Sequence, residues 1–249
     1  MSGHSKWATI KHQKGAKDAK RGKLFAKLAR QIEVAARAGG GEANTNAALR
    51  TAVLKAKSGQ MTNEAIDRAI KRGSGGDDGG TYEAITYEGY APGGVALMVD
   101  TLTDNRNRTG ANIRTIFSKL GGSMAEPGAV GWQFSRKGVI IVDGVVGEDE
   151  LMLAALDAGA DDIARDGDDW RVFSAPNHVY DVQAALVAAG MAVKSAESTM
   201  VSSVDVEVTD AGDARKILRI MDALEDDDDV QDVFSNFDIS DDLLEAVAE

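Results

Sequence analysis

The chain has 249 residues, 43% of them hydrophobic and 27% charged, a composition that can bury a core and excludes disordered and fibrous proteins. Because single domains commonly hold about 100 to 150 residues, this length favours two or three domains over one. The absence of Cys excludes disulfides, thiolate metal sites and thiol nucleophiles, and it suits a reducing cytoplasm, where we expect the protein. No apolar run approaches the roughly 18 residues of a membrane span, so we expect no membrane partner.

The net charge is distributed unevenly along the chain. Its formal value of −12 at pH 7 argues, taken alone, against a nucleic-acid-binding protein. Residues 1–72, however, hold 16 Lys and Arg against 5 Asp and Glu, a net charge of +11, whereas residues 73–249 hold 12 against 35, a net charge of −23. The chain therefore combines a basic N-terminal part with an acidic remainder, and these present different surfaces.

The basic part predicts three helices. The first is an amphipathic helix over residues 16–38 that ends at a run of three glycines, and the others are expected over 44–58 and 62–72. Apolar side chains at helical spacing form one stripe of the first helix, and a separate basic flank lies beside it. This flank consists of Lys20, Lys23, Lys27, Arg30 and Arg37. We therefore expect a small helical domain over residues 1–72 with one basic face.

Residues 73–80 contain five glycines and no apolar side chain, which predicts a flexible linker. After it, the pattern alternates between strands and helices. Strands are expected over 82–87, 95–102, 138–142, 191–208 and 230–237 and on both sides of an Asp166-Gly167 turn, and helices over 107–120, 148–158, 177–189 and 211–225.

These elements predict a multidomain α+β protein with two βαβ-rich units, each of ferredoxin-like size and too short for a Rossmann sheet. The segment 131–203 looks complete in itself, whereas 81–130 lacks its second half until 204–249. The simplest assembly is a three-helix N-terminal domain, a discontinuous second domain formed by 81–130 and 204–249, and a third domain, 131–203, inserted into the second.

The basic N-terminal segment is the first candidate site. A phosphate backbone attracts such a run of cations, and the interspersed aromatic rings can stack on bases. A solvated tail is the alternative interpretation, and the matching basic flank of the following helix favours nucleic-acid contact. The candidate binding residues here are Lys6, Trp7, Lys11, His12, Lys14, Lys17, Lys20, Arg21, Lys23, Lys27 and Arg30.

The second candidate is the segment Thr103–Thr109 (TDNRNRT), expected between a strand and a helix. Its Arg forks and the helix-terminal amides could bind phosphate. The structural alternative is helix capping, which needs only one Asn, and two Arg side chains at a helix start oppose the helix dipole. The candidate residues are Asn105, Arg106, Asn107 and Arg108.

The remaining segments favour structural roles. Residues 87–94 (YEGYAPGG) form a tight turn without the Lys-Ser/Thr end of a nucleotide-hydrolysing P-loop. The acids around 166–169 and 225–229 lack the spacing of a calcium loop, and none of the three His pairs with a recognisable nucleophile. We therefore expect no enzyme, no metal, no cofactor and no small-molecule substrate.

Several of these motifs together resemble one family. Five motifs follow one another in the order found in the YebC/PmpR family: Gly3–Trp7 (GHSKW), Ile10–His12 (IKH), Tyr87–Tyr90 (YEGY), Thr103–Thr109 and Asp226–Ile239. That family includes the mitochondrial translational activator of cytochrome c oxidase subunit I. The resemblance implies three domains, with the third inserted into the second, and a bacterial cytoplasmic protein. It also implies a regulator long described as a DNA-binding transcription factor and linked to the ribosome and to translation of proline-rich stretches.

Three functional hypotheses follow. The chain could be an RNA-binding translation factor on the ribosome, a regulator that binds double-stranded DNA, or an acidic scaffold that binds only proteins. A DNA reader should place a helix in the major groove, but the third helix would turn Glu64 and Asp67 toward phosphates. The basic segment and the 103–109 loop could instead follow an irregular surface of ribosomal RNA or tRNA, which favours the ribosome. The sequence does not indicate an oligomeric state.

Overall fold

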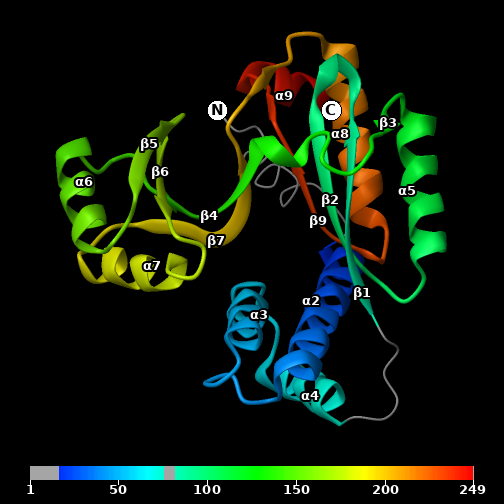
Figure 1. The fold of residues 1–249 in the computed structure, drawn as a ribbon. Helices are drawn as coiled ribbons and strands as arrows, with labels where there is room; N and C mark the ends of the chain where they lie inside the picture. The colour runs from blue at the N-terminus through cyan, green and yellow to red at the C-terminus, as the bar shows by residue number, and fades with distance from the viewer. Residues whose placement is uncertain (1–16, 76–81, 249) are drawn as a thin grey trace. The chain divides into compact units, whose positions relative to one another are not determined.

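The computed structural model describes residues 17–75 and 82–248 (Figure 1). Helices and antiparallel sheets are combined in several domains, which confirms the expected α+β multidomain fold class. The chain divides into two compact units. The smaller is the continuous segment Trp132–Asp205, and the larger contains the other described residues. In the described ranges, no helix combines the length and the apolar character needed to cross a membrane.

The N-terminal part of the larger unit consists of the helices α2 (Lys17–Gly39), α3 (Ala47–Ser58) and α4 (Asn63–Ser74), as expected from the sequence. The side chains of Asn46 and Thr62 cap α3 and α4 by accepting hydrogen bonds from the third residue of each helix. The apolar faces of the three helices meet in one core. Its buried members include Leu28, Ile32, Leu49, Ile66 and Ala69.

Helix α4 extends into the predicted linker. Gly73 and Ser74 belong to the helix, so the expectation that the linker begins at residue 73 is wrong. The physical reason is close packing: Gly73 is buried, and a Cβ atom there would collide with the carbonyl oxygen of Glu33 in α2. Gly73 therefore lets two helices approach each other instead of ending one. Residues 76–80 of the expected linker lie outside the described residues.

The second domain is built on an antiparallel sheet with the strand order β3-β1-β2-β9. Its strands are β1 (Glu83–Tyr90), β2 (Ala96–Thr103), β3 (Ser123–Met124) and β9 (Val230–Ser235). Two helices, α5 (Arg106–Leu120) and α8 (Ala211–Asp226), lie side by side against this sheet (Figure 1). Residues of the inner helix faces, such as Phe117 and Met221, form the core with the central strand β2.

Short elements complete this domain. The 3₁₀ turn Pro92–Gly94 joins β1 to β2, and its glycines have φ values of 76° and 78°, which confirms the expected tight turn. A further 3₁₀ turn, Gly131–Gln133, precedes β4. The strand β8 (Val206–Glu207) pairs in parallel with β10 (Phe237–Asp238), and the helix α9 (Asp241–Ala248) follows. The sequence patterns do not predict β3 or α9.

The smaller unit has the βαββαβ order and the sheet order β5-β6-β4-β7 of a ferredoxin-like domain. Neighbouring strands are antiparallel throughout. A turn at Asp166-Gly167, where Gly167 has a φ of 62°, joins β5 to β6 as expected. The elements are β4 (Phe134–Val142), α6 (Glu148–Asp157), β5 (Asp162–Asp166), β6 (Asp169–Ser174), α7 (Val179–Ala188) and β7 (Val193–Ser202).

Candidate nucleic-acid interface

The predicted basic site falls partly within the described residues. Lys6, Trp7, Lys11, His12 and Lys14 lie outside them. Lys17 and Lys20 belong to the first turn of α2, although their side chains are not described. The other cations of this group lie further along α2, where Arg21 and Lys23 are exposed and Lys27 and Arg30 are half-buried.

Three of these cations contact an acidic segment, which we define as residues 225–232 (EDDDDVQD), where α8 ends and β9 begins. Lys23, Lys27 and Arg30 share one face of α2 because they are four and three residues apart. Lys23 Nζ donates to the carbonyl of Asp226 at 3.0 Å, and Lys27 Nζ donates to the carbonyl of Glu225 at 2.6 Å. Arg30 Nη1 lies 2.9 Å from the carbonyl oxygen of Asp228.

The end of α8 explains why it binds these cations. The last carbonyls of a helix lack intrahelical donors, and the helix dipole places negative charge there. Helix α8 has no basic residue in its last turn, where Glu225 and Asp226 add further negative charge. Lys23 and Lys27 supply the missing donors and the missing positive charge from α2. The contact thus satisfies a helix end that its own sequence leaves unfavourable.

Two further pairs extend the same contact. Lys55 of α3 binds the Asp232 carboxylate at 2.8 Å and 3.0 Å, and Gln31 Nε2 lies 3.3 Å from Gln231 Oε1. Burial lowers the pKa of Lys27, and the neighbouring carboxylates of the acidic segment offset this effect only in part. Lys23, Lys27 and Arg30 of the basic flank are therefore held against carboxylates and carbonyls rather than facing solvent alone.

Asp229 is the buried member of the acidic segment, with a side chain only 8% exposed. Its carboxylate accepts hydrogen bonds from Arg108 Nη2 and Thr109 Oγ1, each at 2.7 Å, and lies 3.3 Å from the Thr103 hydroxyl. Arg30 Nη1 approaches its other oxygen at 3.3 Å. One carboxylate therefore joins α2, the end of β2, the start of α5 and the start of β9.

The pKa of Asp229 reflects these contacts. Burial alone would raise it, but the hydrogen bonds from Arg108 and Thr109 and the positive charges of Arg108 and Arg30 outweigh burial and lower the pKa below its usual value. Conversely, the hydrogen bonds to Asp229 and Asp104 raise the pKa of Arg108. Both groups are therefore charged at neutral pH.

Several residues of the 103–109 segment therefore have structural roles. Asn105 caps α5 by accepting from the backbone of Arg108 at 3.1 Å, which matches the structural alternative. Arg108 forms ion pairs with Asp104 and Asp229. Arg106 has a side chain 69% exposed with one ion pair to Glu83 at 3.4 Å, and Asn107 is exposed. Arg106 and Asn107 are therefore the better placed of the four candidates to meet a ligand.

Additional cations are exposed on the N-terminal part formed by α2, α3 and α4, which we call the helical part. They are Arg50 and Lys57 of α3 and Arg68, Lys71 and Arg72 of α4, and Arg72 also pairs with Glu33 of α2. On α4, Glu64 and Asp67 are exposed in the N-terminal half, where a major-groove recognition helix would offer side chains to base edges. The cations are thus spread over three helices instead of lining one reading helix.

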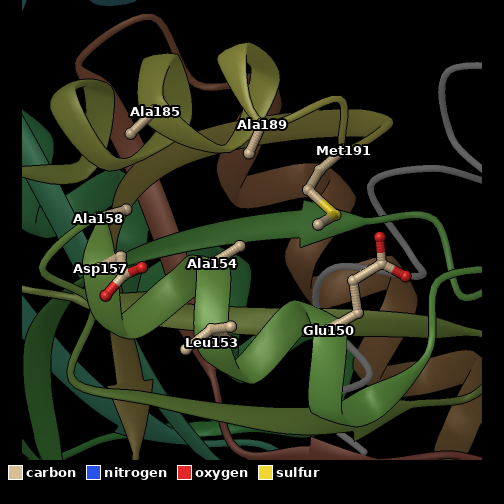
Figure 2. Close-up of a pocket in the computed structure, with 8 residues that line it drawn as sticks. All are labelled: Glu150, Leu153, Ala154, Asp157, Ala158, Ala185, Ala189 and Met191. Carbon is tan, nitrogen blue, oxygen red and sulfur yellow. The ribbon is translucent and has the colours of Figure 1, made fainter.

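The smaller unit offers a different kind of surface. A shallow groove between α6 and α7 has a volume of about 400 Å³ and is lined mainly by small apolar side chains, with the carboxylates of Glu150 and Asp157 along α6 (Figure 2). Carboxylates repel a phosphate backbone, so this groove is a less favourable surface for nucleic acid than the exposed cations of α2, α3 and α4. Within the described ranges, no group of three or more His, Cys, Asp or Glu is arranged to hold a metal ion.

Sequence reasoning misses the role of Asp229 and of its partners Thr103 and Thr109. From the sequence, the acids at 225–229 look like solvated charges after a helix end. A usable signal is present, because a run of acids and a basic helix flank in one chain can pair with each other. What the sequence does not indicate is that the two segments, about 200 residues apart, lie together.

Comparison with known proteins identifies the family. The family model described as the TACO1/YebC protein N-terminal domain matches residues 5–76, and that of the TACO1/YebC second and third domain matches residues 82–237. The chain is similar to proteins named probable transcriptional regulatory protein, with 56% identity in Rubrobacter xylanophilus and 53% in Syntrophobacter fumaroxidans, and each alignment covers both chains completely.

A solved structure agrees with these matches. The crystal structure of a conserved hypothetical protein from Aquifex aeolicus is 43% identical and superposes with a TM-score of 0.76, covering 90% of this chain and 93% of that one. The chain, with its helical part, its acidic segment and its ferredoxin-like unit, therefore belongs to the TACO1/YebC family.

Proposed function

We propose that this protein is a non-enzymatic regulator of gene expression that binds nucleic acid through its helical part, and that its target is RNA on the ribosome. The observation that carries the proposal is the group of exposed cations on α2, α3 and α4 in a chain whose remainder is strongly acidic. Phosphate contacts by Lys and Arg supply most of the affinity of such surfaces. The acidic remainder restricts which side of the protein can approach the phosphates.

RNA is favoured over duplex DNA by the arrangement of the charges. A major-groove reader needs one helix with base-reading side chains near its N-terminus, whereas α4 has Glu64 and Asp67 there. Cations distributed over three helices suit the irregular backbone of folded RNA better. A role in translation through proline-rich stretches is the finer proposal that the family resemblance implies, and it requires only that the protein position RNA.

Duplex DNA is the second candidate, because the relatives from Rubrobacter xylanophilus and Syntrophobacter fumaroxidans carry the name probable transcriptional regulatory protein. A DNA-binding regulator would show a specific affinity for particular promoter sequences that clearly exceeds its non-specific affinity. An RNA-binding translation factor would instead bind ribosomes and show no promoter preference.

Co-sedimentation with ribosomes over graded salt tests the proposal. We expect the wild type to bind at low salt and Arg68→Ala/Lys71→Ala to bind about tenfold more weakly, since two phosphate contacts are lost. Arg215→Ala/Arg219→Ala on α8 is the matched control, because it removes the same charge from exposed positions outside the helical part.

Two outcomes would contradict the proposal. If the wild type stays off ribosomes at low salt but protects one promoter sequence from cleavage, the protein is a DNA-binding regulator. If the control loses as much ribosome affinity as Arg68→Ala/Lys71→Ala, the interface does not lie on the helical part.

A further inference from the structure

Three cations of the basic flank of α2, Lys23, Lys27 and Arg30, are already bound by the acidic segment of the same chain. We propose that residues 225–232 act as an intramolecular competitor that occupies Lys23, Lys27, Arg30 and Lys55 until nucleic acid displaces it. The inference rests on the proposed function, and it adds that binding is coupled to the release of α2 and α3 from the acidic segment.

The atoms that the cations of α2 and α3 contact resemble those of a phosphate backbone. Lys23 and Lys27 bind carbonyl oxygens at 3.0 Å and 2.6 Å, and Lys55 binds both oxygens of the Asp232 carboxylate. A phosphodiester likewise offers oxygen atoms that accept hydrogen bonds, together with a negative charge. A cation on this face can therefore satisfy its donors with the acidic segment or with a nucleic acid, but not fully with both.

The contact between the helical part and the acidic segment can open without unfolding either domain. Two of the ion pairs, Lys23–Asp226 and Lys55–Asp232, are partly open to water, whereas Arg30 and Asp229 are more buried. Exposed pairs contribute little and weaken with salt. The helical part and the second domain also have separate cores, one centred on Ile32 and Leu49 and the other on Phe117 and Ile217. Releasing the acidic segment therefore need not disturb either core.

Only part of the acidic segment would exchange its partners, because the segment itself is held in α8 and β9. Asp229 is buried and bound by Arg108 and Thr109 from its own domain, so it stays in place when Arg30 leaves. Asp226 and Asp232 lie on either side of it in the chain, and their carboxylates pair with Lys23 and Lys55 of the helical part. These two carboxylates are therefore the ones to neutralise in a test.

A crosslink tests the competition directly. The chain has no Cys, so Gln31→Cys/Gln231→Cys introduces the only thiols, at positions whose native amides lie 3.3 Å apart. After reaction with a short bismaleimide, α2 is tied to β9. We expect the crosslinked protein to bind a single-stranded RNA at least about tenfold more weakly than the same variant capped with N-ethylmaleimide.

Charge variants provide the complementary measurement. Asp226→Asn/Asp232→Asn should bind the RNA about three to ten times more tightly than the wild type, because two competing pairs are removed. The matched control, Asp161→Asn/Asp168→Asn, removes the same charge from exposed positions of the smaller unit and should change affinity less than about twofold.

The outcomes separate the two proposals. If the wild type binds RNA but the crosslinked and capped forms bind equally well, or the two pairs of Asn variants are equivalent, the competition is overturned and the proposed function stands. If no form binds RNA or ribosomes at low salt, both are overturned.

Discussion

The acidic segment contains one carboxylate that is fixed and others that are exchangeable. Asp229 is buried and receives strong hydrogen bonds from Arg108 and Thr109, whereas Asp226 and Asp232 are more exposed and pair with Lys23 and Lys55. The side chains are chemically identical, so burial and the number of donors around each carboxylate separate the two roles. Where water is excluded, removing one partner leaves the others unsatisfied, whereas at the surface water replaces a lost partner.

The largest effect should come from Asp229→Ala. We expect the free energy of unfolding to fall by about 2–3 kcal/mol, because the hydroxyls of Thr103 and Thr109 lose their buried acceptor and Arg108 loses an ion pair. Urea unfolding followed by circular dichroism measures it. Asp228→Ala is the control, since its side chain is exposed and its carbonyl, which the substitution keeps, contacts Arg30. Equal losses in both variants would remove the distinction between the fixed and exchangeable carboxylates.

The close contact between α4 and α2 at Gly73 involves no charged pair and provides a comparison with the acidic segment. Gly73→Ala should destabilise the helical part by about 1–2 kcal/mol, because the new methyl group would collide with the backbone of α2 at Glu33. Gly22→Ala, in α2 where the new methyl group would meet open space, should instead be neutral or stabilising by up to about 1 kcal/mol. Thermal unfolding of both variants tests this, and a stable Gly73→Ala variant would mean that α4 does not need to approach α2 closely.

The pH dependence of stability should identify the fixed carboxylate. Because the pKa of Asp229 is lowered on folding, its contribution is complete above the ordinary Asp value of about 4 and is lost as the pH falls through the folded value. The urea midpoint of the wild type should therefore decrease more steeply below about pH 4 than that of Asp229→Asn. Parallel curves for the two proteins would show that Asp229 is not the group responsible.

The smallest effect on stability is expected for Asp226→Asn/Asp232→Asn. Exposed pairs of this kind contribute less than about 1 kcal/mol in total, so the unfolding curve should move only slightly at pH 7. The same variant should bind RNA more tightly, so stability and affinity would change independently. A loss of stability as large as that of Asp229→Ala would make these carboxylates structural.

Local patterns are sufficient to predict most elements of this fold. The periodicity of α2 and α5, the Asp166-Gly167 turn and the glycines after Pro92 each reflect rules that act within a few residues. Gly73 looks like part of a linker because its reason is a tertiary contact with Glu33 rather than a break in the chain. The short strand β3 carries too few residues for any periodicity to indicate it.

The candidate site is less accessible to sequence reasoning. The basic flank of α2 follows from charge and helical spacing, but its pairing with residues 225–232 depends on the folded topology. The same holds for Arg108, which looks like a phosphate ligand in the sequence but lies beside Asp229 in the fold. Charge patterns therefore locate cations, whereas only the fold shows which of them already have partners.

The most direct test of competition is a double-mutant cycle on Lys55 and Asp232, whose side chains are joined by hydrogen bonds to both carboxylate oxygens. RNA affinity is measured for the wild type, Asp232→Asn, Lys55→Gln and the double variant at one salt concentration. If the two partners compete, Asp232→Asn tightens binding about threefold when Lys55 is present and has almost no effect in the Lys55→Gln protein. An equal gain in both backgrounds would mean that Asp232 repels RNA in general, and the competition between acidic segment and nucleic acid would be contradicted.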